Sequence, residues 1–472
     1  MSCGAGEEQT YLSLSTGLCR QCGRRVEARY VALGRELHLE KHCPEHGISR
    51  ALVAEDLSWY LDAMQGATMS TPPERFLERT HSCPQSCGPC ELHAQRCNLP
   101  VFSITNACDL RCPICFTFNR ADRVYNMSVE EFGRQIDFVV EATGGVDLVN
   151  LTGGEPTLHP QLLELLEKAR RPEIGRVTLN SNGLTLADDA ALARRLAELG
   201  VYVVLSCDTF DAARSKRIHG KDIVEKKRRA LEQLERHGVQ TTLLMVLVGG
   251  VNEDELGAML ELLREKDFVR SLTIQTMTYT GQGGGLFEPR QHLPVDRVER
   301  LIEEAMGGQI KRADFAPLPS AHPLCYGVSY LLFDRERRPH PFSRLLARDD
   351  LMRMFSEGYL VRPSAELEAK LKEAIERIWS EGGAPELLGA MKDLLKATYP
   401  SGRSLSPHER QRAAESMVKT IYVHAHMDED TWEVGRAMRC PDQVPVDAER
   451  LIGACNYNLF YRQHDERFWV KP

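Results

Sequence analysis

Three cysteines, Cys108, Cys112 and Cys115, stand in the pattern C-x3-C-x2-C within the stretch ACDLRCPICF. Thiolates are the usual protein ligands of iron–sulfur clusters. Three of them on one short loop can ligate three irons of a 4Fe–4S cubane and leave the fourth iron open to a chelating small molecule. Zinc is the alternative, but zinc loops usually offer C-x2-C pairs with tetrahedral completion. The pattern therefore predicts a 4Fe–4S cluster with one open iron.

A second group repeats this pattern at Cys83, Cys87 and Cys90, and Cys97 follows closely. We expect a closed auxiliary 4Fe–4S cluster with Cys97 as its fourth ligand and His93 as the rival. A second open cluster and a zinc site are the alternatives, because four ligands in a short span also suit zinc.

A third group lies near the N-terminus. Cys19 and Cys22 form a C-x2-C pair, and Cys43 and His46 follow as C-x2-H, with a hairpin turn expected near Gly34. This spacing indicates a zinc-ribbon or rubredoxin-like knuckle that holds zinc or iron. Three thiolates and one imidazole suit zinc better than rubredoxin iron. A segment this small buries little core, so the metal would supply much of its stability, and electron transfer is the alternative role.

The last three grouped cysteines, Cys325, Cys440 and Cys455, are widely separated in the sequence. Their separation fits a second auxiliary cluster, held by a C-terminal domain that folds over the mouth of the active site. His322 or Asp442 would complete the set, or the cluster would be open. The alternative is three unrelated buried thiols, which are common in protein cores. Between these cysteines, residues 364–397 predict a pair of helices, as a lid or an insertion.

The composition excludes some classes of partner and compartment. The chain has 472 residues and a net charge of −8, which does not suit a nucleic-acid partner. The first residues have neither the basic start nor the apolar run of a signal peptide, and no apolar stretch is long enough to span a bilayer. Grouped cysteines in a cytosolic protein indicate metal sites or catalysis more often than disulfides. We therefore expect a soluble, cytoplasmic protein.

From about residue 100 to residue 281, β-rich runs alternate with amphipathic helical runs, which predicts a parallel sheet with right-handed crossovers. Ser128 and Glu131 are expected to form a capping box at the start of one helix, and Asp188 and Gly200 to bound another. Polar motifs follow the strands, as in βα barrels. The expected strands are PVFSIT, VDLVNLTGG, RVTLNSNG, VYVVLSCD, QTTLLMVLVGG and SLTIQTMTY.

The cysteine loop and the motifs that follow the later strands resemble those of radical S-adenosylmethionine (SAM) enzymes. The segments concerned are GGEP, NSNG, SCD and VGGVN. The resemblance implies that they hold the amino group, the carboxylate, the ribose and the adenine of SAM. The residues expected to bind SAM are Gly153, Gly154, Glu155, Pro156, Asn182, Ser206, Asp208 and Gly249.

Nearly the whole chain resembles one branch of that superfamily. This branch contains the archaeal 7,8-dihydro-6-hydroxymethylpterin dimethyltransferase and the tetraether lipid synthases. The shared segments include LCRQCG, KHCPEHG, CPQSCGPCELH, AHPLCYGVSYLL and ACNYN. The chain departs from the branch at Ser320 and Tyr326, where additional cysteines are expected, so the C-terminal cluster and the substrate do not carry over directly.

The resemblance implies an α/β fold, a partial (β/α)6 TIM barrel of radical SAM type with an N-terminal metal knuckle and a C-terminal cluster-binding domain. We expect the knuckle in residues 1–75, an auxiliary cluster segment in 76–99, the barrel in 100–300 and the C-terminal domain in 301–472.

The resemblance also implies the reaction: a reduced cluster cleaves SAM to a 5′-deoxyadenosyl radical, which takes hydrogen from an unactivated carbon. The electron would come from a one-electron donor such as flavodoxin or ferredoxin. We expect C-methylation of a small molecule, pterin-like or a natural-product precursor, with a reduced folate as one methyl source. Carbon–carbon coupling of lipid tails is the first alternative. A non-enzymatic, metal-binding interaction protein is the second, although the intact Cys108, Cys112 and Cys115 argue against it.

Overall fold

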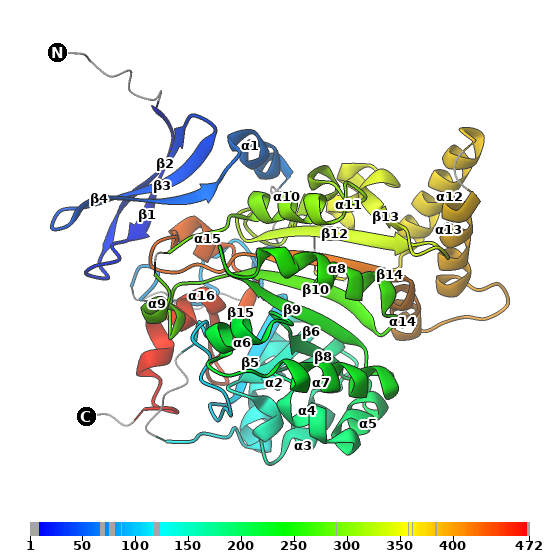
Figure 1. The fold of residues 1–472 in the computed structure, drawn as a ribbon, viewed down its shortest axis with the longest axis horizontal. Coiled ribbons are helices and arrows are strands. Elements are labelled where there is room, and N and C mark those ends of the chain that lie inside the picture. The colour runs from blue at the N-terminus through cyan, green and yellow to red at the C-terminus, as the bar shows by residue number, and fades with distance from the viewer. Residues whose placement is uncertain are drawn as a thin grey trace.

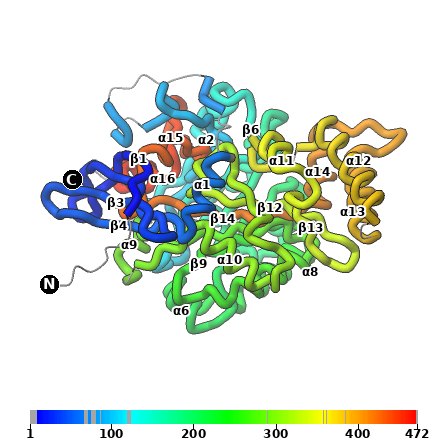
Figure 2. The backbone as a smooth tube through the Cα atoms, turned by 90° about the horizontal axis from the view of Figure 1, so that it is seen from above, coloured from blue at the N-terminus to red at the C-terminus, as the bar shows by residue number. Residues whose placement is uncertain are grey.

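The computed structural model describes residues 9–66, 71–74, 81–85, 87–117, 123–288, 290–356, 358–360, 362–382 and 385–469. An N-terminal antiparallel sheet lies at one end of the molecule and a larger sheet forms its centre (Figures 1 and 2). Gly34, with φ of 58°, makes the expected turn between the second and third strands. The small sheet and its following helix are β1 (Gln9–Leu18), β2 (Arg25–Leu33), β3 (Glu36–Cys43), β4 (Gly47–Ala54) and α1 (Leu57–Gly66).

Six adjacent parallel strands form the predicted partial barrel, in the order in which they occur along the chain. They are β5 (Leu99–Thr105), β6 (Val146–Gly153), β7 (Ile174–Ser181), β8 (Tyr202–Ser206), β9 (Thr241–Leu247) and β10 (Val269–Thr276). Their crossovers supply α2 (Val129–Thr143), α3 (Leu162–Ala169), α4 (Leu184–Asp188), α5 (Ala190–Glu198), α6 (Ala212–His219), α7 (Val224–Arg236) and α8 (Leu256–Glu265). The largest apolar core lies between these strands and helices.

The helix caps agree with the sequence in part. Ser128 caps α2, and its hydroxyl accepts the Glu131 amide at 3.1 Å as predicted. The Glu131 carboxylate accepts from the Tyr125 hydroxyl at 2.6 Å instead of completing the capping box. The expectation that Asp188 caps a helix is wrong, because Asp188 ends the short helix α4. The cap of α5 is Asp189, whose side chain accepts from the Leu192 amide at 2.9 Å.

The C-terminal region extends both edges of the barrel sheet. Strand β14 (Val418–His424) pairs parallel to β10, and β15 (Asp442–Pro445) pairs parallel to β5, which gives eight adjacent parallel strands. Antiparallel strands β12 (Tyr326–Phe333) and β16 (Leu451–Gly453) lie outside them. The C-terminal part is therefore continuous with the barrel sheet. The remaining short elements here are α9 (Gly283–Leu286), α10 (Val295–Ala305), β11 (Ala316–Pro317), β13 (Pro339–Pro341), α11 (Arg348–Met354), α15 (Val434–Met438) and α16 (Ala454–Asn456).

The predicted helical pair is present as α12 (Ala365–Ser380) and α13 (Pro385–Thr398), followed by α14 (Pro407–Met417). The pair projects at the end of the molecule opposite the N-terminal sheet (Figures 1 and 2). It packs on a second apolar core with β12, so it acts as an insertion at the side of the barrel. Among the described residues, no helix combines the length and the apolar character that a bilayer crossing requires.

The two edges of the parallel sheet are joined by the side chain of Asp442, on β15, which is 4% exposed. Tyr326, on β12, donates its hydroxyl to one carboxylate oxygen at 2.5 Å, and Tyr359 donates to the other. His424, on β14, lies 3.6 Å from the same carboxylate. Because the strand order ends at β15 and β16 on this side, side chains close the gap that backbone pairing leaves in the described sheet.

We expect Asp442→Ala to lower the free energy of unfolding by about 2–4 kcal/mol, because two buried phenol hydroxyls lose their acceptor. Urea denaturation followed by circular dichroism measures the loss. Asp447→Ala removes a 41% exposed aspartate from the same segment and serves as the control. Equal midpoints for the two variants would contradict the role of Asp442 as a closing contact.

Candidate functional site

A cavity of about 360 Å³ lies inside the barrel. The cysteine loop and the turns after the strands line one end, and Arg176, near the start of β7, lines the other. Arg176 and Asn182 are six positions apart, which is about 20 Å of extended chain. The cavity therefore runs along the barrel and holds more than a single small ring.

The cysteine loop is held against two glycines. The Gly154 amide donates to the Thr105 carbonyl at 2.7 Å, and the Glu155 amide to the Ala107 carbonyl at 2.6 Å. A Cβ on Gly153 would lie 2.0 Å from the Thr105 oxygen, and one on Gly154 would lie 2.1 Å from the Ala107 oxygen. Only glycine permits this approach. The two glycines thus position the backbone that leads into the cysteines, in addition to facing the cavity.

Cys108, Cys112 and Cys115 all line the cavity. Burial raises the pKa of the Cys108 thiol to about 12 and also raises that of Cys112. Within the described residues, two groups bring three or more possible ligand atoms within 4.8 Å of one another, and these three cysteines belong to neither. The three sulfurs are soft donors on one loop, and they are spaced more widely than the ligands of a single ion. This spacing fits a cluster of several irons. The loop therefore suits a 4Fe–4S cluster.

The structure places most of the residues expected to bind SAM around the same end of the cavity. Glu155 is fully engaged there: its carboxylate accepts from the Ser181 hydroxyl at 2.8 Å and the Asn182 amide at 2.6 Å. Gly249 lies elsewhere, and a Cβ on it would meet Gln291 at 2.9 Å. The cavity-lining members of the predicted set are Gly153, Gly154, Glu155, Asn182, Ser206 and Asp208, whereas Pro156 and Gly249 do not line it. Their individual roles toward SAM stay predictions.

Lys227, on α7, is a site residue that the sequence analysis missed. It is 1% exposed, and its ammonium donates to the carbonyls of Asn182 and, at 2.6 Å, Ser206. It thereby ties together the turns after β7 and β8. Lys227, Ala230 and Leu234 share the buried face of α7, so helical periodicity within the charged run VEKKRRA offered a signal.

Asp208 and His219 connect this corner to the cysteines. Asp208 accepts the Val246 amide at 2.6 Å, and burial raises the pKa of its carboxyl to about 6. His219 lies 3.5 Å from Asp208 and 3.7 Å from the Cys112 sulfur. Burial lowers the pKa of His219 to about 3, so its ring is neutral at physiological pH. A neutral ring beside Cys112 can donate one hydrogen bond without adding charge.

Aromatic and imidazole rings form the wall that closes the barrel. The rings of His424 and Tyr326 stack with centroids 3.9 Å apart, and those of His426 and Phe116 with centroids 5.0 Å apart. All four, with Asp442, line the cavity. The motif HAH, in which His424 ends β14 and His426 follows two positions later, is a sequence signal for this wall.

The second cysteine group adjoins the C-terminal region. The Asn456 side-chain amide donates to the sulfurs of Cys87 at 3.1 Å and Cys83 at 3.5 Å. The hydrogen bond with Cys87, then burial, raise the pKa of the Cys83 thiol. Cys97 lies in the barrel core, and His93 lies 3.3 Å from the Cys440 carbonyl. The expected cluster with Cys97 as fourth ligand stays a prediction.

Cys325, Cys440 and Cys455 lie near enough to influence one another's charge, although their sulfurs are not all within 4.8 Å of one another. Burial, then the charges of Cys455 and Cys325, raise the pKa of Cys440. Arg436 donates to the Cys325 sulfur at 3.4 Å, and the Met427 amide to the Cys455 sulfur at 3.3 Å. These donors suit thiolate ligands.

At the two departures from the branch, Tyr326 bonds to Asp442, and the buried Ser320 hydroxyl has no hydrogen-bond partner among the described residues. Asp442 already accepts two phenols, and His322 accepts the Leu324 amide at 3.2 Å. The fourth ligand of the cysteine set stays a prediction.

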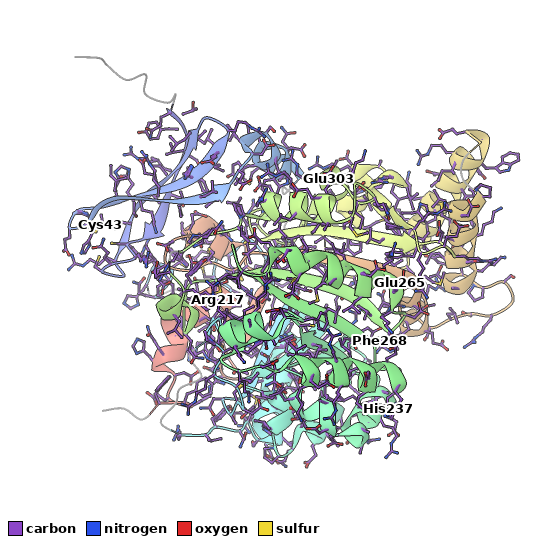
Figure 3. All side chains as sticks on the ribbon, viewed as in Figure 1. Cys43, Arg217, His237, Glu265, Phe268 and Glu303 are labelled. Carbon is purple, nitrogen blue, oxygen red and sulfur yellow. The ribbon has the colours of Figure 1, made fainter. Side chains whose placement is uncertain are left out.

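The N-terminal group is brought together as predicted. The ligand atoms of Cys19, Cys22, Cys43 and His46 all lie within 4.8 Å of one another. The His46 ring nitrogen is 3.4 Å from the Cys43 sulfur and 3.5 Å from the Cys19 sulfur. Figure 3 shows Cys43 at the outer end of the small sheet, away from the barrel. This position and donor set favour a structural zinc ion.

We expect Lys227→Met to weaken SAM binding by about tenfold or more, because two strand-end turns lose a shared charged donor. Calorimetric titration of SAM into anaerobically reconstituted protein measures the change. Lys226→Met is the matched control, since the neighbouring lysine is 41% exposed and pairs with Asp188. Unchanged affinity in Lys227→Met would contradict this positioning role.

We expect Cys22→Ala to lose zinc and Cys112→Ala to keep it, because the knuckle and the cysteine loop are separate sites. Metal analysis by mass spectrometry tests this, with iron measured in the same samples. Loss of zinc from both variants would show that the two sites are not independent.

The comparisons with known proteins agree with the presence of the barrel and of a separate N-terminal knuckle. Residues 102–263 match the Radical SAM superfamily model, and residues 11–55 match the HMPTM N-terminal zinc ribbon domain. The 7,8-dihydro-6-hydroxymethylpterin dimethyltransferase of Methanocaldococcus jannaschii is 26% identical over 96% of this chain and 95% of its own. GTP 3′,8-cyclase of Chlorobaculum tepidum is 34% identical over 37% of this chain and 52% of its own.

Among solved structures, Streptococcus suis SuiB bound to S-adenosylmethionine aligns with a TM-score of 0.39 and 19% identity, over 45% of this chain and 47% of its own. The superfamily match covers the strands and loops that build the cavity end with the three cysteines. The alternative of a non-enzymatic interaction protein is therefore set aside. The chain is an enzyme of the radical SAM superfamily.

Proposed function

We propose that this enzyme C-methylates a small, flat nitrogen heterocycle related to a pterin. The M. jannaschii relative whose name specifies a pterin dimethyltransferase aligns with nearly the whole chain, including the knuckle and the C-terminal region. The cyclases align only with about a third to a half of it. The C-terminal strands that complete the cavity therefore have their counterpart in the pterin enzyme.

The observation that carries the proposal is the ring-lined, polar wall of the cavity. Tyr326, Tyr359, His424 and His426 line this wall, and Asp442 accepts hydrogen bonds from the two tyrosines. Aromatic faces stack on heterocycles, and imidazoles can donate or accept one hydrogen bond each. A volume of about 360 Å³ is in the range of small-molecule sites. Coupling of lipid tails would require an apolar groove, whereas Asp442, His424 and His426 place polar groups in this wall.

The chain's own residues have defined tasks in this proposal. When bound, the reduced cluster and SAM supply a radical able to remove hydrogen from an unactivated carbon. Cys108, Cys112 and Cys115 hold the cluster, and Lys227 with Glu155 fixes the turns around SAM. The enclosing strands exclude water from the reacting carbon. The two further cysteine groups are proposed auxiliary clusters, with a flavodoxin or ferredoxin as the source of electrons.

The test is isotope tracing in cells that make the native chain or Cys112→Ala, grown with methyl-deuterated methionine. We expect a pterin species that gains deuterated methyl groups only with the native chain. An unlabelled methyl group would identify a donor other than SAM, such as a reduced folate. A coupled lipid that lacks two hydrogens would replace the proposal with tail joining.

The same pair of proteins supplies the control in vitro. Reduced, reconstituted native protein should form 5′-deoxyadenosine from SAM, and Cys112→Ala should form none, because it lacks a ligand to the cluster. Deoxyadenosine formation without any methylated species in the extracts would leave the radical chemistry in place and contradict the proposed substrate class.

A further inference from the structure

A second, smaller cavity of about 30 Å³ adjoins the first at the base of the barrel. Arg176, Ser271, Leu360 and Tyr422 line both cavities, so the small one extends the large one away from the cysteines. A cavity of about 10–15 Å³ suffices for one water molecule. The extension therefore has room for a compact group of a few heavy atoms.

Two buried arginines line the small cavity. The Arg176 side chain is 11% exposed, pairs with Glu415 at 3.0 Å and stacks over the Tyr202 ring at 4.1 Å. Arg270 is 8% exposed, and one terminal nitrogen donates to the Ser416 carbonyl at 2.6 Å. Among the described residues, no carboxylate forms an ion pair with Arg270. Its contacts at the end of α14 use carbonyl oxygens only.

The charges at this site do not balance. Glu415 is the one carboxylate among the described residues that line the small cavity, and the Tyr202 hydroxyl also donates to it, at 2.5 Å. The carboxyl end of α14 adds about half a negative charge. Two guanidinium groups therefore exceed the one carboxylate that lines the cavity; the charge of Asp267 also acts on Arg270, but Asp267 forms its ion pair with Arg337. Burial and the charge of Arg270 lower the pKa of nearby Lys419 to about 7, in keeping with a positive environment.

Each of the two arginines also has one side-chain N–H group without an acceptor in the described part of the chain. The Nε atoms of Arg176 and Arg270 are buried and have no hydrogen-bond partner within the described part of the chain. A buried, unsatisfied donor on a charged group costs more than one on a neutral group. An anion between the two side chains would satisfy the donors and offset the excess charge at once. Guanidinium groups match carboxylate and phosphate oxygens in geometry as well as in charge.

We propose that the base of the barrel binds a compact oxyanion, a carboxylate or a phosphate, between Arg176 and Arg270. The oxyanion is either the end of the substrate or a free ion. In the first case, which rests on the proposed function, the substrate lies along the barrel with its reacting carbon toward the cysteines and its anionic end at the base.

Thermal unfolding of the full-length, reconstituted chain tests the site with sodium phosphate and sodium acetate at constant ionic strength. We expect both probes to raise the melting temperature of the native chain and their affinity to fall about tenfold to hundredfold in Arg270→Gln, since a charged donor is lost. Arg335→Gln removes a 90% exposed arginine and is the matched control.

Arg270→Lys keeps the positive charge and should retain weakened binding of the anions. It provides a second test in case Arg270→Gln does not fold. The absence of stabilisation by either anion in the native chain would overturn the proposal. Equal stabilisation of the native chain and of both Arg270 variants would overturn it as well.

Fluorescence titration with pterin-6-carboxylate and neutral 6-hydroxymethylpterin identifies the source of the oxyanion. Binding of the carboxylate at least tenfold tighter in the native chain but not in Arg270→Gln, with competition by phosphate, would assign the site to the substrate. Equal binding of both pterins without competition would assign it to a free ion. Stabilisation by phosphate with no pterin binding would support the anion site and contradict the proposed substrate class.

Discussion

The carboxylate of Asp442 is the contact on which the enclosed site depends. A parallel sheet that is not closed by backbone pairing leaves two open edges, and open edges expose unpaired groups. Here Tyr326 and His424 meet Asp442 from the far edge, and Tyr359 donates to it from a connecting segment. These buried side chains thus join two strand edges that no backbone hydrogen bonds join in the described sheet. It also turns the interior of the sheet into a cavity, so fold closure and site formation have one cause.

At the other end of the cavity, contacts made to backbone atoms set the geometry. Gly153 and Gly154 let the turn after β6 touch the backbone of the cysteine loop, and Lys227 fixes the next two turns through their carbonyls. Each contact joins neighbouring strand ends. Because parallel strands bring those ends to one edge, these local contacts join the turns after β5 and β6 and the turns after β7 and β8. The rim is therefore rigid where SAM and the reacting carbon must be aligned.

Much of this could be predicted from the sequence, because the signals are local. Strand β6 and its glycine turn, the Ser128 cap and the knuckle ligands are each encoded within a few residues. The C-terminal strands were not predicted as part of the barrel. Strand β14 pairs with β10 across more than a hundred residues, and nothing in either segment specifies the partner. Lys227 was hidden for a different reason: its charged neighbours in α7 face solvent.

The distribution of charge along the cavity suggests how a substrate would be oriented. A cluster held by Cys108, Cys112 and Cys115 would make one end electron-rich, whereas Arg176 and Arg270 make the base positive. Unit charges about 20 Å apart interact by about 0.8 kcal/mol at an effective dielectric constant of 20. That energy alone gives only a modest preference between two orientations. Direct hydrogen bonds at the base are worth more than the long-range field, so the arginine pair, rather than the overall potential, would decide which end of the substrate faces the cysteines.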